Sequence, residues 1–125
     1  MLQILLVALG GGIGSAARYV VGGWFAIRFG AAFPYGTLVI NVTGSFIIGL
    51  FLAFARDRIW LGPNWRVFFA VGLVGGYTTF STFEYETIRL LQDGQMLLGM
   101  VYLFASVLTG AMATIGGIAL GSSIQ

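Results

Sequence analysis

The sequence lacks cysteine and histidine, and it has few charged residues. Without cysteine the chain forms no disulfide and offers no thiol nucleophile. Without histidine it has no imidazole for metal binding or acid–base catalysis. Only 8% of its 125 residues are charged, compared with about 25% in a typical soluble domain. Lysine is absent, and the arginines form no basic cluster that would indicate nucleic-acid binding. Such a chain cannot cover a water-facing surface.

What the sequence has instead is apolar residues, which make up 58% of the chain. A membrane-spanning helix needs about 20 mostly apolar residues, and four segments meet this requirement. We therefore expect an all-α membrane protein with one four-helix transmembrane domain over residues 1–125. The predicted spans are residues 2–27, 36–55, 65–91 and 96–120.

Glycine is abundant, with 20 residues. Small residues four positions apart let helices approach closely in lipid. We expect three such pairs to serve packing within or between subunits. The pairs are Gly10 with Gly14, Gly72 with Gly76, and Gly117 with Gly121.

The arginines barely define an orientation in the membrane. Three lie in or beside the loop between the second and third spans, and two lie on the opposite side. Arg18 lies inside the first span, and if it is counted with the second side the two sides carry equal numbers of arginines. Either weak signals set the topology, or the chain inserts in both orientations. The second alternative permits an antiparallel dual-topology homodimer. A pore is also easier to build between two copies than through one small, filled bundle.

Residues 75–86 form the most informative segment, because they place hydroxyls, glycines and carboxylates inside a predicted span. Polar groups at membrane depth usually mark a pathway or a binding site. Glycine costs about 1 kcal/mol in a helix interior, and β-branched residues add to this. The sequence therefore predicts a break in the third helix between Gly75 and Thr79. Carbonyls released by the break are good ligands for a monovalent cation such as sodium.

The second and third spans carry candidate anion ligands. Thr37, Asn41 and Ser45 are each four residues apart, so they share one helix face. The Asn41 amide needs partners, and interhelical hydrogen bonding is the alternative role. Phe80 and Phe83 share a face three residues apart. Phenylalanine in a span is ordinarily packing, but the positive edge of its ring can also meet a small anion.

The fourth span carries a stripe of hydroxyls at Tyr102, Ser106 and Thr114. Single hydroxyls in spans often bond to their own helix, yet two such stripes favour a polar track. Glu84 and Glu86 point to nearly opposite sides of a helix and make no catalytic pair. We expect Glu86 to pair with Arg89 instead. With no nucleophile–base set, the sequence predicts no enzyme.

Three linked motifs resemble those of the Fluc fluoride channels, also called CrcB-type fluoride export proteins. The resemblance covers the whole chain. The motifs are Gly14-Ser-Ala-Ala-Arg18-Tyr, the Gly36-Thr-Leu-x-Ile-Asn41-x-Thr-Gly-Ser segment, and the run from Gly75 to Glu86.

The resemblance implies a multi-pass inner-membrane channel that exports fluoride passively, with two pores in an antiparallel dual-topology homodimer. It implies a structural sodium ion at the dimer centre, held by the backbone carbonyls of Gly75 and Thr78. It also implies a set of pore-lining residues and a vestibule. The pore set is Asn41, Phe80, Phe83, Ser81, Thr82, Tyr102, Ser106 and Thr37, and the vestibule set is Arg18, Glu86 and Thr114.

Two other functions are weighed against this one. Small multidrug resistance transporters are also short four-span chains that pair in opposite orientations. They need a membrane-embedded carboxylate in the first span, where this chain has Arg18 and no acid. A structural assembly subunit would explain the glycine pairs but not the polar stripes.

Overall fold

The computed structural model describes residues 1–124 and contains only helices and loops within them. Four helical segments follow one another as predicted. Their elements are α1 (Leu2–Phe29), α2 (Tyr35–Ala55), α3 (Pro63–Arg66), the π-helix η1 (Val67–Val74), α4 (Gly75–Tyr77), α5 (Phe80–Gln92) and α6 (Met96–Ser123).

Helices α1, α2 and α6 are each long and apolar enough to cross a membrane. Their bounds closely match the first, second and fourth predicted spans. The shortest, α2, has 21 residues, which is about 31 Å at 1.5 Å per residue. This length matches the hydrocarbon core of a bilayer, about 30 Å. The chain is therefore a multi-pass membrane protein.

The third segment, residues 63–92, is interrupted at Thr78 and Thr79, which confirms the predicted break. Both residues have extended backbone, with φ/ψ of −79°/158° and −149°/118°. Helix α5 has only 13 residues, or about 20 Å, so it cannot cross the membrane alone. The wide π-helix η1 lies before the break and was not predicted.

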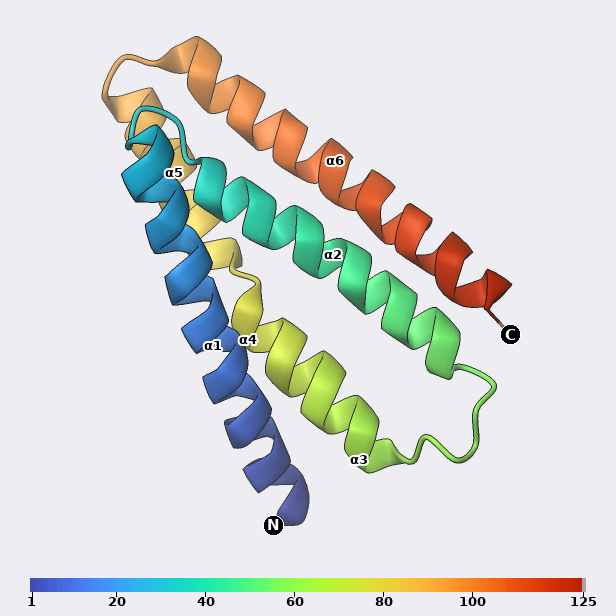
Figure 1. Cartoon of the computed structure of the whole chain (residues 1–125). Helices are drawn as coiled ribbons and strands as arrows, with labels where there is room; N and C mark the ends of the chain where they lie inside the picture. The colour runs from blue at the N-terminus through green and yellow to red at the C-terminus, as the bar shows by residue number, and fades with distance from the viewer. Residues whose placement is uncertain (125) are drawn as a thin grey trace.

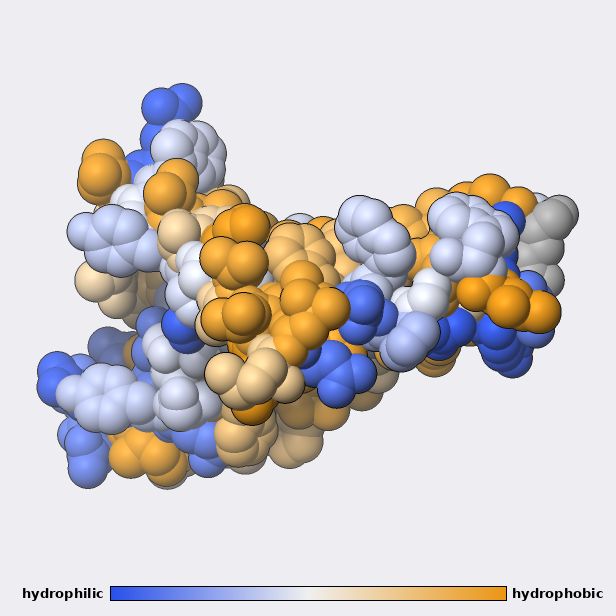
Figure 2. All heavy atoms as spheres, turned by 90° about the horizontal axis from the view of Figure 1, so that it is seen from below, coloured by the Kyte–Doolittle hydropathy of each residue, from blue (hydrophilic) through white to orange (hydrophobic). Residues whose placement is uncertain are grey.

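The helices pair in two sets (Figure 1). Helix α6 runs alongside α2, and α1 crosses the half of the third segment that holds η1 and α4. Helix α5 lies beside the beginning of α6. Figure 2 shows apolar residues over much of one face of the molecule, with hydrophilic residues in smaller groups between and around them. Large apolar side chains such as Ile4, Val107 and Ile115 are exposed, as expected of a surface covered by lipid or protein.

Glycine contacts hold both helix pairs together, as the spacing predicted. A Cβ on Gly14 of α1 would overlap the carbonyl oxygen of Leu73 and lie 2.8 Å from the nitrogen of Tyr77. A Cβ on Gly117 of α6 would overlap the Phe46 carbonyl oxygen on α2. Gly10, Gly72, Gly76 and Gly121 make similar backbone contacts. Each helix pair therefore approaches at a distance that only glycine permits.

Two arginines cap the C-terminal end of α2. Arg58 donates to the carbonyl oxygens of Phe54 and Ile124, and its guanidinium lies 3.6 Å from the centre of the Phe54 ring. Arg66 donates to the Ala55 carbonyl oxygen at 2.5 Å. Carbonyls at a helix end lack intrahelical partners, so these two arginines serve as donors that cap α2.

We predict that Gly14→Ala destabilises the protein by about 1–3 kcal/mol, because the added methyl group forces α1 away from the third segment. Gly12→Ala is the matched control, since its Cβ meets no atom within 4 Å and alanine favours the helix. Thermal unfolding in detergent measures both. Equal stability of the two variants would contradict this packing.

Candidate functional site

The side chain of Asn41 on α2 holds the break in the third segment. Its Nδ2 donates to the Thr79 carbonyl oxygen at 2.9 Å, and its Oδ1 accepts from the Thr79 N–H at 2.8 Å. The amide thus pairs with both backbone groups of one residue, as a neighbouring strand would. Asn41 therefore makes the interhelical hydrogen bonds that were the alternative to a role as an anion ligand. One of the two Nδ2 hydrogens remains for another acceptor.

Thr79 also caps helix α5. The Thr82 N–H donates to the Thr79 hydroxyl oxygen at 3.3 Å, and that hydroxyl donates to Thr82 Oγ1 at 3.1 Å. In an unbroken α-helix, the N–H groups of Thr79 and Thr82 would donate to the carbonyls of Gly75 and Thr78. Here they donate elsewhere, so these two carbonyls lose their α-helical donors.

Gly75 and Thr78 line a cavity of about 260 Å³ together with Asn41, Ser45 and Phe80. Phe80, beside this cavity, is 72% exposed. The polar groups here are an amide, hydroxyls and backbone, all of them neutral. Within residues 1–124 no three histidine, cysteine or acidic side chains come together to bind a metal. A cation in this cavity would therefore depend on carbonyl oxygens.

Phe80 begins a row of aromatic rings that leads into the core. Its ring centre lies 6.0 Å from that of Phe83, which lies 5.2 Å from that of Tyr102 on α6. Phe83 is 5% exposed and Tyr102 is fully buried. The two phenylalanines therefore share a helix face, as predicted, but within one chain only Phe83 is enclosed.

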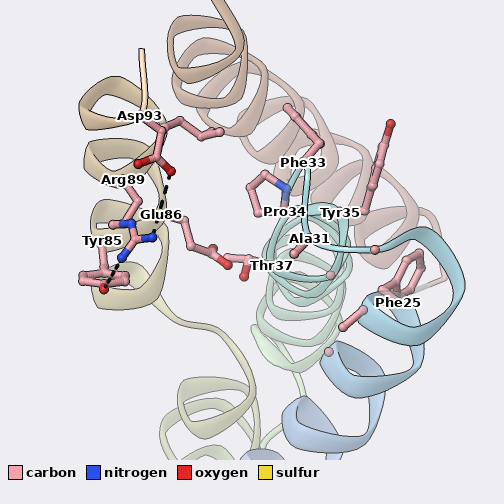
Figure 3. Close-up of a pocket in the computed structure, with 15 residues that line it drawn as sticks. Phe25, Ala31, Phe33, Pro34, Tyr35, Thr37, Tyr85, Glu86, Arg89 and Asp93 are labelled. Carbon is pink, nitrogen blue, oxygen red and sulfur yellow. Dashed lines mark hydrogen bonds and ion pairs between the residues drawn. The ribbon is translucent and has the colours of Figure 1, made fainter. Parts of the chain in front are cut away.

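The buried Tyr102 hydroxyl donates to Glu86 Oε1 at 2.9 Å. Glu86 and Thr37 line a second cavity, of about 500 Å³, and Figure 3 shows the Glu86 carboxylate beside Thr37. The predicted pairing of Glu86 with Arg89 is wrong. Arg89 lies 4.0 Å from Asp93 instead and donates to the Tyr85 hydroxyl at 3.4 Å. Glu86 points inward toward α6, whereas Arg89 lies on the exposed side of α5.

Arg18 lies on a broad groove of about 930 Å³ beside α1. Thr37, Thr79 and Thr82 line the same groove. The structure thus places Arg18 on the same groove as threonines of the break and of α2, although these residues are far apart in the sequence.

Three of the predicted site residues make no side-chain hydrogen bond to the residues described above. They are Ser106, Ser81 and Thr114. The Ser106 hydroxyl is buried and has no hydrogen-bond partner within the described chain. Ser81 is exposed on α5. The Thr114 hydroxyl donates to the Gly110 carbonyl oxygen at 3.0 Å, and it lies about 18 Å along α6 from Tyr102. Glu86 and Thr114, predicted to share a vestibule, are not neighbours within one chain.

The contacts that Thr79 and Phe33 make were not predicted from the sequence. Threonine directly before an apolar helix is a favoured N-cap, so the signal for Thr79 was available. Phe33 packs on Tyr102 from the loop between α1 and α2, with 5.5 Å between ring centres. Nothing in the local sequence shows which distant ring a loop phenylalanine will contact.

Comparison with known proteins gives matches over nearly the full length of the chain. The family model described as "CrcB-like protein, Camphor Resistance (CrcB)" matches residues 5–118. A protein of Acidobacterium capsulatum named fluoride-specific ion channel FluC is 48% identical over 123 residues, 98% of each chain. Proteins of Rhizobium meliloti and Chloroflexus aurantiacus with the same name are 48% and 46% identical. They match 96% and 97% of this chain and 96% of their own lengths.

We predict that Asn41→Ala lowers the stability of the protein by about 2–4 kcal/mol, because both backbone groups of the buried residue Thr79 lose a hydrogen-bond partner. Asn64→Ala removes an amide from the exposed start of the third segment and should leave stability nearly unchanged. Denaturant unfolding in detergent measures both. A parent-like unfolding curve for Asn41→Ala would show that the amide does not hold the break.

Proposed function

This chain belongs to the CrcB-like family, and we propose that it is a fluoride-selective channel and not an enzyme. It would let fluoride leave the cell passively through the inner membrane. The observation that carries the proposal is the 48% identity over 98% of the chain to a protein named as a fluoride-specific channel. The neutral donors around the helix break support it.

The physical requirement on such a path is that it replace the tightly held water of a small anion. The free hydrogen of the Asn41 amide, beside the exposed Phe80 ring, offers a donor and a positive ring edge at one place. Phe83 continues the path toward Tyr102. The orphan hydroxyl of Ser106, one turn along α6 from Tyr102, is a buried donor in need of an acceptor. Neutral groups of this kind bind an anion weakly enough to release it.

Thr37, Ser81 and Thr82 would extend the polar track beside these groups. The groove at Arg18 would form a vestibule. The Arg18 guanidinium would attract fluoride to the pore entrance without lying in the path of the ion. Glu86, held by the Tyr102 hydroxyl, would lie at the other end. Thr114 stays a prediction for the outer part of the path.

We propose further that two chains assemble as an antiparallel homodimer with two pores. Within one chain Phe80 is 72% exposed. All the residues that line the cavity beside it come from α2 and the third segment, so the cavity is open on the side away from these helices. A second copy against this side would enclose both. The near balance of arginines between the two sides of the chain is compatible with opposed orientations.

The carbonyls of Gly75 and Thr78 fit a structural sodium ion at the centre of this dimer. Both line one cavity and both have lost their α-helical donors. Unwound carbonyls and helix C-terminal ends are the groups that coordinate sodium in broken membrane helices. The second copy would supply the same two carbonyls, and the bound charge would hold the two breaks against each other.

The decisive measurement is fluoride efflux from proteoliposomes, with chloride as the control ion. We expect rapid fluoride-specific efflux that needs no proton gradient. Cation–proton exchange in place of fluoride flux would support a multidrug transporter. If neither fluoride nor cations were transported, the structural assembly subunit would be the remaining interpretation.

We predict that Asn41→Asp abolishes fluoride flux, because a carboxylate removes donors and repels the anion. Phe80→Ile should severely reduce flux by removing the polarised ring edge. Asn64→Asp adds the same charge at an exposed position and should conduct like the parent. The same efflux assay compares all three. Parent-like flux in Asn41→Asp and Phe80→Ile would refute the assignment of these residues to the pore.

We predict that prolonged removal of sodium lowers fluoride flux, and that sodium, but not a large organic cation, restores it. The reason is that the carbonyls around the break repel one another without a cation between them. Efflux is compared after dialysis into sodium or into N-methylglucamine. Full flux after exhaustive dialysis without sodium would contradict the proposed ion.

A further inference from the structure

We propose that Phe33, in the loop between α1 and α2, is a positioning residue for the fluoride path. It acts through Tyr102, whose ring it holds in the orientation that fixes Phe83. This inference rests on the proposed function.

The four rings form one continuous row. Phe33 meets Tyr102 edge to face, with 5.5 Å between ring centres and 80° between ring planes. Tyr102 meets Phe83 in the same manner, at 5.2 Å and 66°, and Phe83 lies 6.0 Å from Phe80. Edge-to-face contacts have a preferred geometry, so the orientation of each ring constrains the next.

Several groups hold Tyr102, and Phe33 is the one that comes from the loop. The Tyr102 hydroxyl donates to Glu86 Oε1 at 2.9 Å and also has Thr37 as a hydrogen-bond partner. The fully buried ring belongs to one core cluster with Phe83 and Leu90. Hydrogen bonds at the end of a ring leave it free to turn about its long axis, so the edge-to-face contact with Phe33 helps to set the plane in which Tyr102 packs on Phe83.

The loop is built to hold Phe33 in place. The Tyr35 N–H donates to the Phe33 carbonyl oxygen at 2.9 Å, and Pro34 restricts the backbone of the residue before it. Figure 3 shows Phe33 and Pro34 at the rim of the cavity that Glu86 lines. Phe33 is half-buried and packs on the core formed by Phe83, Leu90 and Tyr102.

The alternative role for Phe33 is plain packing that anchors the loop. Plain packing predicts lower stability in Phe33 variants but unchanged conduction in the protein that does fold. A positioning role predicts a change in flux and in selectivity between fluoride and chloride. It also predicts that an aromatic replacement restores both.

The test compares Phe33→Leu, Phe33→Met and Phe33→Tyr in the proteoliposome assay, with flux normalised to folded dimer. We expect Phe33→Leu and Phe33→Met to lower fluoride flux about 3- to 10-fold and to lower the fluoride-to-chloride ratio. Phe33→Tyr keeps the ring and should restore both. Phe69→Leu is the control, since Phe69 is also half-buried but packs on Phe51, away from these rings, and it should conduct like the parent.

A second measurement asks whether Phe33 acts through Tyr102. In a Tyr102→Leu background the ring that Phe33 orients is gone, so adding Phe33→Leu should cause little further loss. Fully additive losses would overturn the proposal, as would parent-like flux and selectivity in Phe33→Leu. It is also overturned if both apolar variants fail to fold while Phe69→Leu folds. A parent protein that conducts no fluoride would instead overturn the proposed function.

Discussion

A backbone N–H or C=O without a partner costs several kcal/mol inside a membrane, and this chain breaks its helical ladder at that depth. The amide of Asn41 supplies both partners for Thr79 at 2.8 and 2.9 Å, and the Thr79 hydroxyl restarts the helix by capping α5. The remaining features of the site depend on this pair. It sets where Phe80 and Phe83 lie, and it frees the carbonyls of Gly75 and Thr78.

The glycine contacts give the break a rigid frame. Helix α1 packs against η1 and α4 through Gly10, Gly14, Gly72 and Gly76, and α6 packs against α2 through Gly117 and Gly121. Both halves of the chain are thus fixed backbone to backbone. Helix α2 belongs to one of these pairs and carries Asn41, which links it to the third segment.

Much of this arrangement could be predicted from the sequence. Four apolar segments, the glycine pairs, the break and the need of Asn41 for partners all follow from local composition and spacing. The π-helix η1, the Tyr102 partner of Glu86 and the contact of Phe33 with Tyr102 do not follow. Each depends on which residues of distant segments meet. Glu86 illustrates this, because Arg89 is its neighbour in sequence while Tyr102 is its partner in space.

The interruption at Thr78 and Thr79 also places two helix ends of opposite polarity at one depth. The helical run that finishes at Tyr77 presents its partly negative carbonyl pole there, and α5 presents its partly positive amide pole from Phe80 onward. A single segment of the chain therefore carries a partly negative and a partly positive helix end side by side in its interior. Both poles come from backbone groups, so the break carries partial charge of either sign that does not depend on the ionisation of a side chain.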